Sequence, residues 1–316
     1  MDSISYSRLS PLEKLEIAID VVRNMDTSMR PLNSDGNPGG LVEFSDDDDR
    51  EIIIIGDLHA NKNNLKRILM DSGNLAKLRD NRAVLVFLGD IIHDDRSGYM
   101  REMESSIKIM EVTLHLLERY PNNVVYILGN HETMNSQIAK HGIQQGLEYR
   151  RALVEYYGEE YANLMQVFFD SLPVFVKHPY FLATHAGPPR GGITREEIIN
   201  IDHFPNLKHQ LLWNRLNELR STPSMKEYGE EDIVETRRLL GCPENIPFIV
   251  GHNPMWKWGG DDSIWINPVG TKNHIILYSN LPKKCPYLVF KDSMQYIVKY
   301  ADLRLKKRRF VLDDYA

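Results

Sequence analysis

The chain has 316 residues and a formal net charge of −6, and 42% of its residues are hydrophobic and 26% charged. These values are typical of a globular protein and exclude a disordered or fibrous chain. The mildly acidic balance argues against general nucleic-acid binding, which usually needs a basic face. No apolar run approaches the length of about 18 residues that a membrane span needs, and the first residues lack a signal-peptide pattern. We therefore expect a cytoplasmic protein that neither crosses a membrane nor binds nucleic acid.

The first fifty residues differ in pattern from the rest of the chain. Residues 11–25 carry apolar side chains at helical spacing, residues 31–40 are rich in Pro, Gly and Asn, and Asp46–Asp49 form an acidic turn. We predict a helical extension over residues 1–50, a catalytic domain over 51–300, and a strand or tail over 301–316.

From Glu51 onward, short apolar runs rich in Val and Ile alternate with helical stretches near 61–71, 98–118 and 136–170. Such runs suit strands that are buried on both faces, and the alternation predicts βαβ units of an open α/β sheet. Helical stretches near 207–220 and 230–240 precede four more strand-like runs, PFIVGH, HIILYS, YLVF and MQYIVKY. These later strands could form a second sheet packed on the first, within a single domain flanked by helices.

The apolar runs end in polar clusters, which are GDLH, GDIIHDD, GNHE and THAG. Ligands of α/β proteins bind at the carboxyl ends of strands, so these clusters are the candidate site. Asp57 and His59 are two residues apart and point to the same side of an extended segment. The later clusters add side chains of the same chemical types: Asp90, Asn130, His131, His185 and His252.

Each of these residues alone is explained by a turn or by a hydrogen-bonded structural histidine. Their joint occurrence at successive strand ends predicts a metal site. The two cysteines, Cys242 and Cys285, are too few for a thiolate cluster, so the ligands are histidine, carboxylate and amide. Nitrogen and oxygen ligands suit manganese, iron or zinc and do not discriminate among them.

The five motifs GDLH, GD, GNHE, THAG and GHNP resemble the signature of the calcineurin-like metallophosphoesterases. FFDSLPVFV, LLWNR and HIILYSN resemble segments of the serine/threonine protein phosphatase branch of that superfamily, and the similarity covers roughly residues 50–290. The resemblance implies an α/β fold, a four-layer α/β/β/α sandwich with mixed central sheets. GHNP stands where the eukaryotic phosphatases have the pattern RxH, which suggests a distant, prokaryotic-type member.

The same resemblance implies roles for the site residues. Asp57, His59 and Asp90 would hold one divalent metal ion, and Asp90 would bridge to a second ion held by Asn130, His185 and His252. His131 would give a proton to the leaving group. The implied activity is hydrolysis of phosphomonoesters, most simply phosphoserine or phosphothreonine in proteins, by in-line attack of a hydroxide bound to the two metals.

The second motif departs from the family pattern. The segment GDIIHDDRSG stands where the phosphatase branch has GDxVDRG, so His93 occupies the position of the carboxylate that orients the catalytic histidine. Either Asp94 or Asp95 would orient His131 instead. For the arginine that grips phosphate we favour Arg96, with Arg215 as the alternative.

Three other functions remain open from the sequence. THAGPP is compatible with a small-molecule phosphatase or pyrophosphatase for nucleotides or dinucleoside polyphosphates. A preference for phosphotyrosine is a second possibility, and a non-catalytic binding module is a third. Trp256, Trp258 and Trp265 follow His252 and could wall a substrate pocket.

Overall fold

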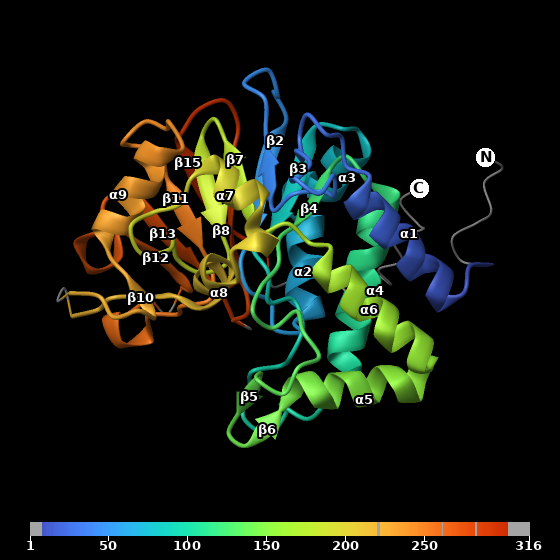
Figure 1. Cartoon of the computed structure of the whole chain (residues 1–316). Coiled ribbons are helices and arrows are strands. Elements are labelled where there is room, and N and C mark those ends of the chain that lie inside the picture. Colours follow the sequence, from blue (N-terminus) through green and yellow to red (C-terminus); the bar gives the residue numbers. More distant parts are fainter. Residues whose placement is uncertain (1–7, 220–221, 261, 282, 303–316) are drawn as a thin grey trace.

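The computed structural model describes residues 8–219, 222–260, 262–281 and 283–302. Two β-sheets lie face to face, with helices on either side (Figure 1). This is the predicted four-layer α/β/β/α arrangement with mixed sheets, which confirms the fold class. Of the tail predicted over 301–316, residues 303–316 lie outside the described residues.

The first sheet has five strands in the order β15-β14-β2-β3-β4. Its parallel core is made of β2 (Glu51–Ile55), β3 (Ala83–Phe87) and β4 (Val124–Tyr126). On the other side of β2, β14 (Pro286–Phe290) pairs antiparallel with β2, and β15 (Tyr296–Tyr300) pairs antiparallel with β14. The run EIIII is thus a central strand, as its apolar sequence predicts.

The second sheet has six strands in the order β1-β7-β8-β11-β13-β12. The strands β8, β11 and β13 run parallel at its centre. The bounds of its members are β1 (Leu41–Glu43), β7 (Phe175–His178), β8 (Phe181–Thr184), β11 (Phe248–Val250), β12 (Ile264–Ile266) and β13 (His274–Leu277).

Alternation of side chains along the strands separates two apolar layers. Ile52 and Ile54 of β2 belong to the cluster between the sheets, together with Ile249 of β11 and Ile275 of β13. Ile53 belongs to the cluster on the helix side. Successive side chains of a strand point to opposite faces, so a run of four isoleucines fills both layers.

Helices cover the outer faces of both sheets. In Figure 1, α1 (Pro11–Arg23), α2 (Lys62–Met70), α3 (Asn74–Arg79), α4 (Glu104–Arg119) and α6 (Glu159–Asp170) lie in one half of the molecule. The other half holds α7 (Arg195–Ile199), α8 (Pro205–Trp213) and α9 (Glu230–Leu239). Among the described helices, none is both long and apolar enough to cross a membrane.

The stretch 136–170, expected to be helical, is divided. It begins as a hairpin of β5 (Ala139–Lys140) and β6 (Ile143–Gln144) and continues as α5 (Gln145–Tyr157) and α6. Gly158 separates the two helices with a φ of 91°, a conformation that glycine adopts at little cost. The stretch expected near 207–220 also ends early, at Trp213, and the chain continues into a short parallel pair of β9 (Arg215–Leu216) and β10 (Glu227–Tyr228).

Residues ahead of Glu51 take part in both the helical layer and a sheet. α1 begins at the capping residue Ser10, packs against α4 and α6, and buries Leu15 and Ile19. β1 pairs in parallel with β7 at the edge of the six-stranded sheet. The predicted extension over 1–50 therefore contributes structure to the sandwich itself.

Truncation of α1's buried face tests this contribution. We expect Leu15→Ala to lower the free energy of unfolding by about 2–5 kcal/mol, because Leu15 is fully buried and a cavity would remain. Glu16→Ala, on the exposed face of the same helix, should change it by less than about 0.5 kcal/mol. Urea denaturation of both variants measures this, and equal small effects would show that α1 is not part of the cooperative fold.

Candidate metal centre

The candidate site lies where the carboxyl ends of both sheets meet. Asp57 follows β2, Asp90 follows β3, His185 follows β8 and His252 follows β11. Asp57 pairs with Tyr278 in an isolated parallel bridge, and its carboxylate oxygens accept the backbone N–H of His252 at 3.1 and 2.9 Å. The ends of two different sheets are thereby held together by a potential metal ligand.

Four of the side chains predicted to bind metal, together with the predicted proton donor His131, converge in two overlapping groups. Ligand atoms of His59, Asp90 and His131 lie within 4.8 Å of one another, and so do those of Asp90, His185 and His252. Asp90 belongs to both groups. The Asn130 Oδ1 lies 2.9 Å from His185 Nε2 and 2.8 Å from His252 Nδ1. His59 Nε2 lies 3.9 Å from carboxylate oxygens of both Asp57 and Asp90.

Backbone carbonyls orient two of the histidine rings. His59 Nδ1 lies 3.0 Å from the carbonyl of His93, and His185 Nδ1 lies 2.8 Å from the carbonyl of Leu88. A carbonyl only accepts hydrogen bonds, so Nδ1 of each ring carries the proton and Nε2 keeps its lone pair. A carbonyl bound to Nδ1, which leaves Nε2 free to bind, is the usual arrangement for a histidine that ligates a metal.

Three carboxylates are buried at the centre of the site. Asp57, Asp90 and Glu132 are at most 2% exposed, and no described lysine or arginine lies within ion-pair distance of any of them. Burial raises the pKa of Asp57, and the charge of Asp90 raises it further. Burial likewise raises the pKa of Asp90 to about 6. Carboxylates so placed fit a bound cation, which would offset their desolvation and mutual repulsion.

Glu132 is a functional residue that the sequence prediction did not single out. Its carboxylate accepts the backbone N–H groups of Asp90, Ile91 and Gly129 at 2.8–2.9 Å. It thus fastens the loop after β3 to the loop after β4, and the glutamate of GNHE was the available sequence signal. Burial raises the pKa of Glu132, and the nearby charge of Asp90 adds to this.

The loops of the site adopt unusual backbone conformations. Asp90, His93 and His252 have φ values of 51°, 66° and 58°, in the left-handed region that side chains other than glycine rarely adopt. Gly251 precedes His252, and a Cβ there would lie 2.0 Å from the Asp57 Oδ1. Strain of this kind persists only where surrounding contacts enforce it, and it clusters at functional sites.

The residues around His131 differ from the sequence prediction. Its Nδ1 lies 3.1 Å from the Nδ1 of His93, and no described contact joins it to Asp94 or Asp95. Asp94 binds the Arg96 guanidinium. Asp95 accepts hydrogen bonds from Tyr278 Oη at 2.8 Å and Asn280 Nδ2 at 2.9 Å. Among the described contacts, neither acid therefore binds the histidine that it was expected to orient.

The site opens into a cavity of about 470 Å³. Arg215 lines it and places Nη1 3.0 Å from the Asn253 Oδ1, whereas Arg96 does not line it and is 61% exposed over the ring of Tyr99. Lys140 of the β5–β6 hairpin also lines the cavity. Three aromatic side chains complete the wall, namely Trp213, Trp256 and Tyr278. Of the three tryptophans that follow His252, only Trp256 lines this cavity, and it is 43% exposed.

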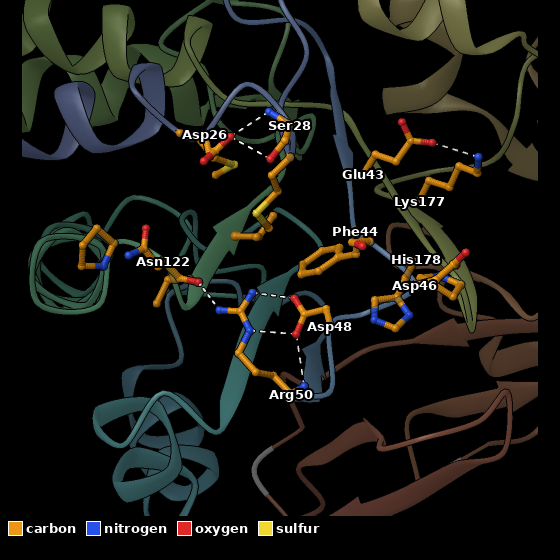
Figure 2. Close-up of a pocket in the computed structure, with 17 residues that line it drawn as sticks. Asp26, Ser28, Glu43, Phe44, Asp46, Asp48, Arg50, Asn122, Lys177 and His178 are labelled. Atoms are coloured by element: carbon orange, nitrogen blue, oxygen red, sulfur yellow. Dashed lines mark hydrogen bonds and ion pairs between the residues drawn. The ribbon is translucent and has the colours of Figure 1, made fainter.

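A larger cavity of about 870 Å³ lies beside the amino-terminal ends of β2 and β4 and carries none of the predicted ligands. Figure 2 shows that its basic side chains, Arg50 and Lys177, are bound to acidic neighbours. Arg50 binds the Asp48 carboxylate at 2.6 Å, and Lys177 binds Glu43 at 2.9 Å. We therefore assign the chemistry to the smaller cavity.

Comparison with known proteins agrees with this geometry. Residues 50–276 match the family model described as calcineurin-like phosphoesterase, so the chain belongs to that family of hydrolases of phosphoric esters. The chain is 30% identical over 224 residues to the serine/threonine-protein phosphatase 4 catalytic subunit of Kluyveromyces lactis, covering 68% of this chain and 60% of that protein. It is 30% identical over 187 residues to the Saccharomyces cerevisiae protein of the same name, covering 56% and 52%.

A solved structure shares the fold. A protein serine/threonine phosphatase from Saccharomyces cerevisiae superposes with a TM-score of 0.67 at 17% identity, covering 92% of this chain and 88% of that one. The matched region spans less than two thirds of the length of both curated relatives. The family is metal-dependent, and the two ligand groups are its candidate metal sites in this chain.

The buried carboxylate of Asp90 makes a pH test possible in chelated protein. Its folded pKa of about 6 lies above the ordinary value of 3.8, so the protonated form is favoured in the folded state. This contribution to stability is complete below pH 3.8 and is lost as the pH rises through about 6. Wild type should lose stability relative to Asp90→Asn between pH 3.5 and pH 7, because the unfolded Asp90 gives up its proton at a lower pH than the folded one. Urea denaturation at both pH values measures the difference, and a difference independent of pH would contradict the assignment.

Proposed function

We propose that this protein is a phosphatase that uses two metal ions to hydrolyse phosphomonoesters, namely phosphoserine or phosphothreonine in proteins. The observation that carries the proposal is the convergence of two ligand groups on one shared carboxylate, Asp90. A shared carboxylate is what a pair of closely spaced metal ions requires. The two phosphatase 4 relatives support the protein substrate.

The residues take the following roles in this proposal. Asp57, His59 and Asp90 hold one ion, while Asp90, Asn130, His185 and His252 hold the other. When bound, the two ions supply an activated water for in-line attack and neutralise charge on the phosphoryl oxygens. His131 lines the cavity beside them and donates a proton to the departing oxygen.

Arg215 is our candidate for the arginine that grips the phosphate. It lines the same cavity as His131 and His252, while the guanidinium of Arg96 is committed to Asp94 outside that cavity. The planar guanidinium of Arg215 can bind two phosphoryl oxygens at once. The geometry therefore favours Arg215 over Arg96, the residue that the motif alone suggested.

The two arginines can be compared directly. We expect Arg215→Ala to lower kcat/KM roughly ten- to hundred-fold, the effect of losing a hydrogen bond to a charged group. Arg96→Ala should stay within about threefold of wild type, because the Arg96 side chain is largely exposed. Steady-state kinetics with a phosphopeptide measures both, and the opposite ranking would return the role to Arg96.

Metal-dependent hydrolysis tests the proposal as a whole. After chelation, Mn²⁺ should restore hydrolysis of 4-nitrophenyl phosphate by wild type and by Asp292→Asn, which changes an exposed carboxylate. Asp90→Asn removes the shared charge and should lose at least about 100-fold. Metal binding without turnover on any phosphoester would support a binding module instead.

The substrate class needs a separate panel. Phosphoserine and phosphothreonine peptides should be hydrolysed with higher kcat/KM than phosphotyrosine peptides, nucleotides or dinucleoside polyphosphates. A preference for nucleotides would move the assignment to the small-molecule alternative without affecting the metal centre.

A further inference from the structure

His93 makes the one described side-chain hydrogen bond to the ring of His131. The two Nδ1 atoms are 3.1 Å apart, and the rings meet at an interplanar angle of 61°. A hydrogen bond between two imidazole nitrogens needs one N–H and one lone pair. One of the two Nδ1 atoms therefore carries a proton, and the other accepts it with its lone pair.

The position of His93 is firmly determined. Its side chain is fully buried, and its backbone adopts the left-handed region with a φ of 66°. The backbone N–H of His93 donates to Ser106 Oγ of α4 at 2.9 Å, and the backbone carbonyl of His93 accepts from the His59 ring. The ring of Tyr149 from α5 packs against it edge-on at 5.6 Å. Two contacts to its backbone and one to its ring thus hold the residue in place.

Proton donation by His131 sets the roles within the pair. Its Nδ1 faces His93, so Nε2 is the atom left to serve the leaving group. As the bond from phosphorus to the leaving oxygen breaks, its electron pair stays on that oxygen, which takes the proton from Nε2. His131 therefore enters the step as the imidazolium, protonated on both nitrogens, and ends as the neutral ring with its proton on Nδ1. That proton is donated to His93 Nδ1 throughout, so the proton of His93 lies on Nε2.

We propose that His93 is the positioning residue of His131, a neutral imidazole acceptor that keeps the proton of His131 on Nδ1 and aims Nε2 at the leaving group. The proposal rests on the role of His131 as proton donor in the proposed function. It assigns to His93 the task that the sequence prediction gave to Asp94 or Asp95.

The chemistry of the side chain suggests the test variants. The Nδ1 of histidine and the Oδ1 of asparagine are both two bonds from Cβ, so His93→Asn can keep an acceptor at the same reach. His93→Leu keeps apolar bulk and removes the acceptor. Tyr149→Phe serves as the matched control, since it preserves the ring that packs on His93 and removes a hydroxyl with no described partner.

The experiment compares two leaving groups in the full-length, Mn²⁺-loaded protein. A phosphoserine peptide releases a poor leaving group that depends on the proton donor, and 4-nitrophenyl phosphate releases a good one. General acid catalysis contributes about 10²–10⁴-fold, so we expect His93→Leu to lower kcat at least about 30-fold on the peptide and less than about fivefold on the aryl ester. His93→Asn should recover most of the loss, and Tyr149→Phe should match wild type on both substrates.

Equal losses on both substrates, or an asparagine variant no better than leucine, would overturn the role of His93 while the proposed function stands. Wild type inactive on both substrates would overturn the proposed function and this inference together. The ¹⁵N NMR spectrum of Zn²⁺-loaded wild type adds a test that needs no variant. It should show the His131 proton on Nδ1, and a neutral His131 protonated only at Nε2 would overturn the proposal.

Discussion

The site depends on the burial of three carboxylates, Asp57, Asp90 and Glu132, at the junction of two sheets. Moving a carboxylate from water into a protein interior costs several kcal/mol unless a partner offsets it. Part of that offset comes from the backbone, since Asp57 accepts the N–H of His252 and Glu132 accepts three N–H groups. The remaining charge of Asp57 and Asp90 faces the histidines, where a cation can bind.

The same carboxylates also organise the fold around the site. Asp57 ties the end of β2 to the loop after β11, and Glu132 ties the loop after β3 to the loop after β4. Four strand ends from two sheets are therefore fastened by groups that also set the charge of the site. The left-handed backbone at Asp90, His93 and His252 is the local cost of this convergence.

The sequence predicted the features that depend on local pattern. The placement of Ile52 and Ile53 in opposite apolar layers follows from strand periodicity, and four of the six residues predicted as ligands, His59, Asp90, His185 and His252, fall within the two groups that could hold a metal ion. Features that depend on distant contacts were not predictable in this way. The β5–β6 hairpin has strands of two residues, too short for a pattern, and β1 pairs with β7, more than 130 residues away in sequence. The His93–His131 contact depends on how the loop after β3 turns, which the motif GDIIHDDRSG does not reveal.

Where the family pattern that the sequence resembles has a carboxylate, this chain has His93, next to the proposed proton donor His131. Burial lowers the pKa of His131 well below its ordinary range, and the other histidines of the site lower it further. The Nδ1 of His131 meets the ring of His93 rather than a carboxylate, so this contact does not stabilise the protonated His131 on which the proposed proton donation depends. In our proposal, His93 therefore positions the ring of His131 and supplies no charge.

The central claim is that Asp90 lies between two metal ions, and crystals grown with Mn²⁺ test it most directly. Anomalous difference density should show two peaks about 3.5–4 Å apart, one beside Asp57 and His59 and the other beside Asn130, His185 and His252. The Asp90 carboxylate should contact both ions. A single ion, or ions bound away from these side chains, would contradict the account.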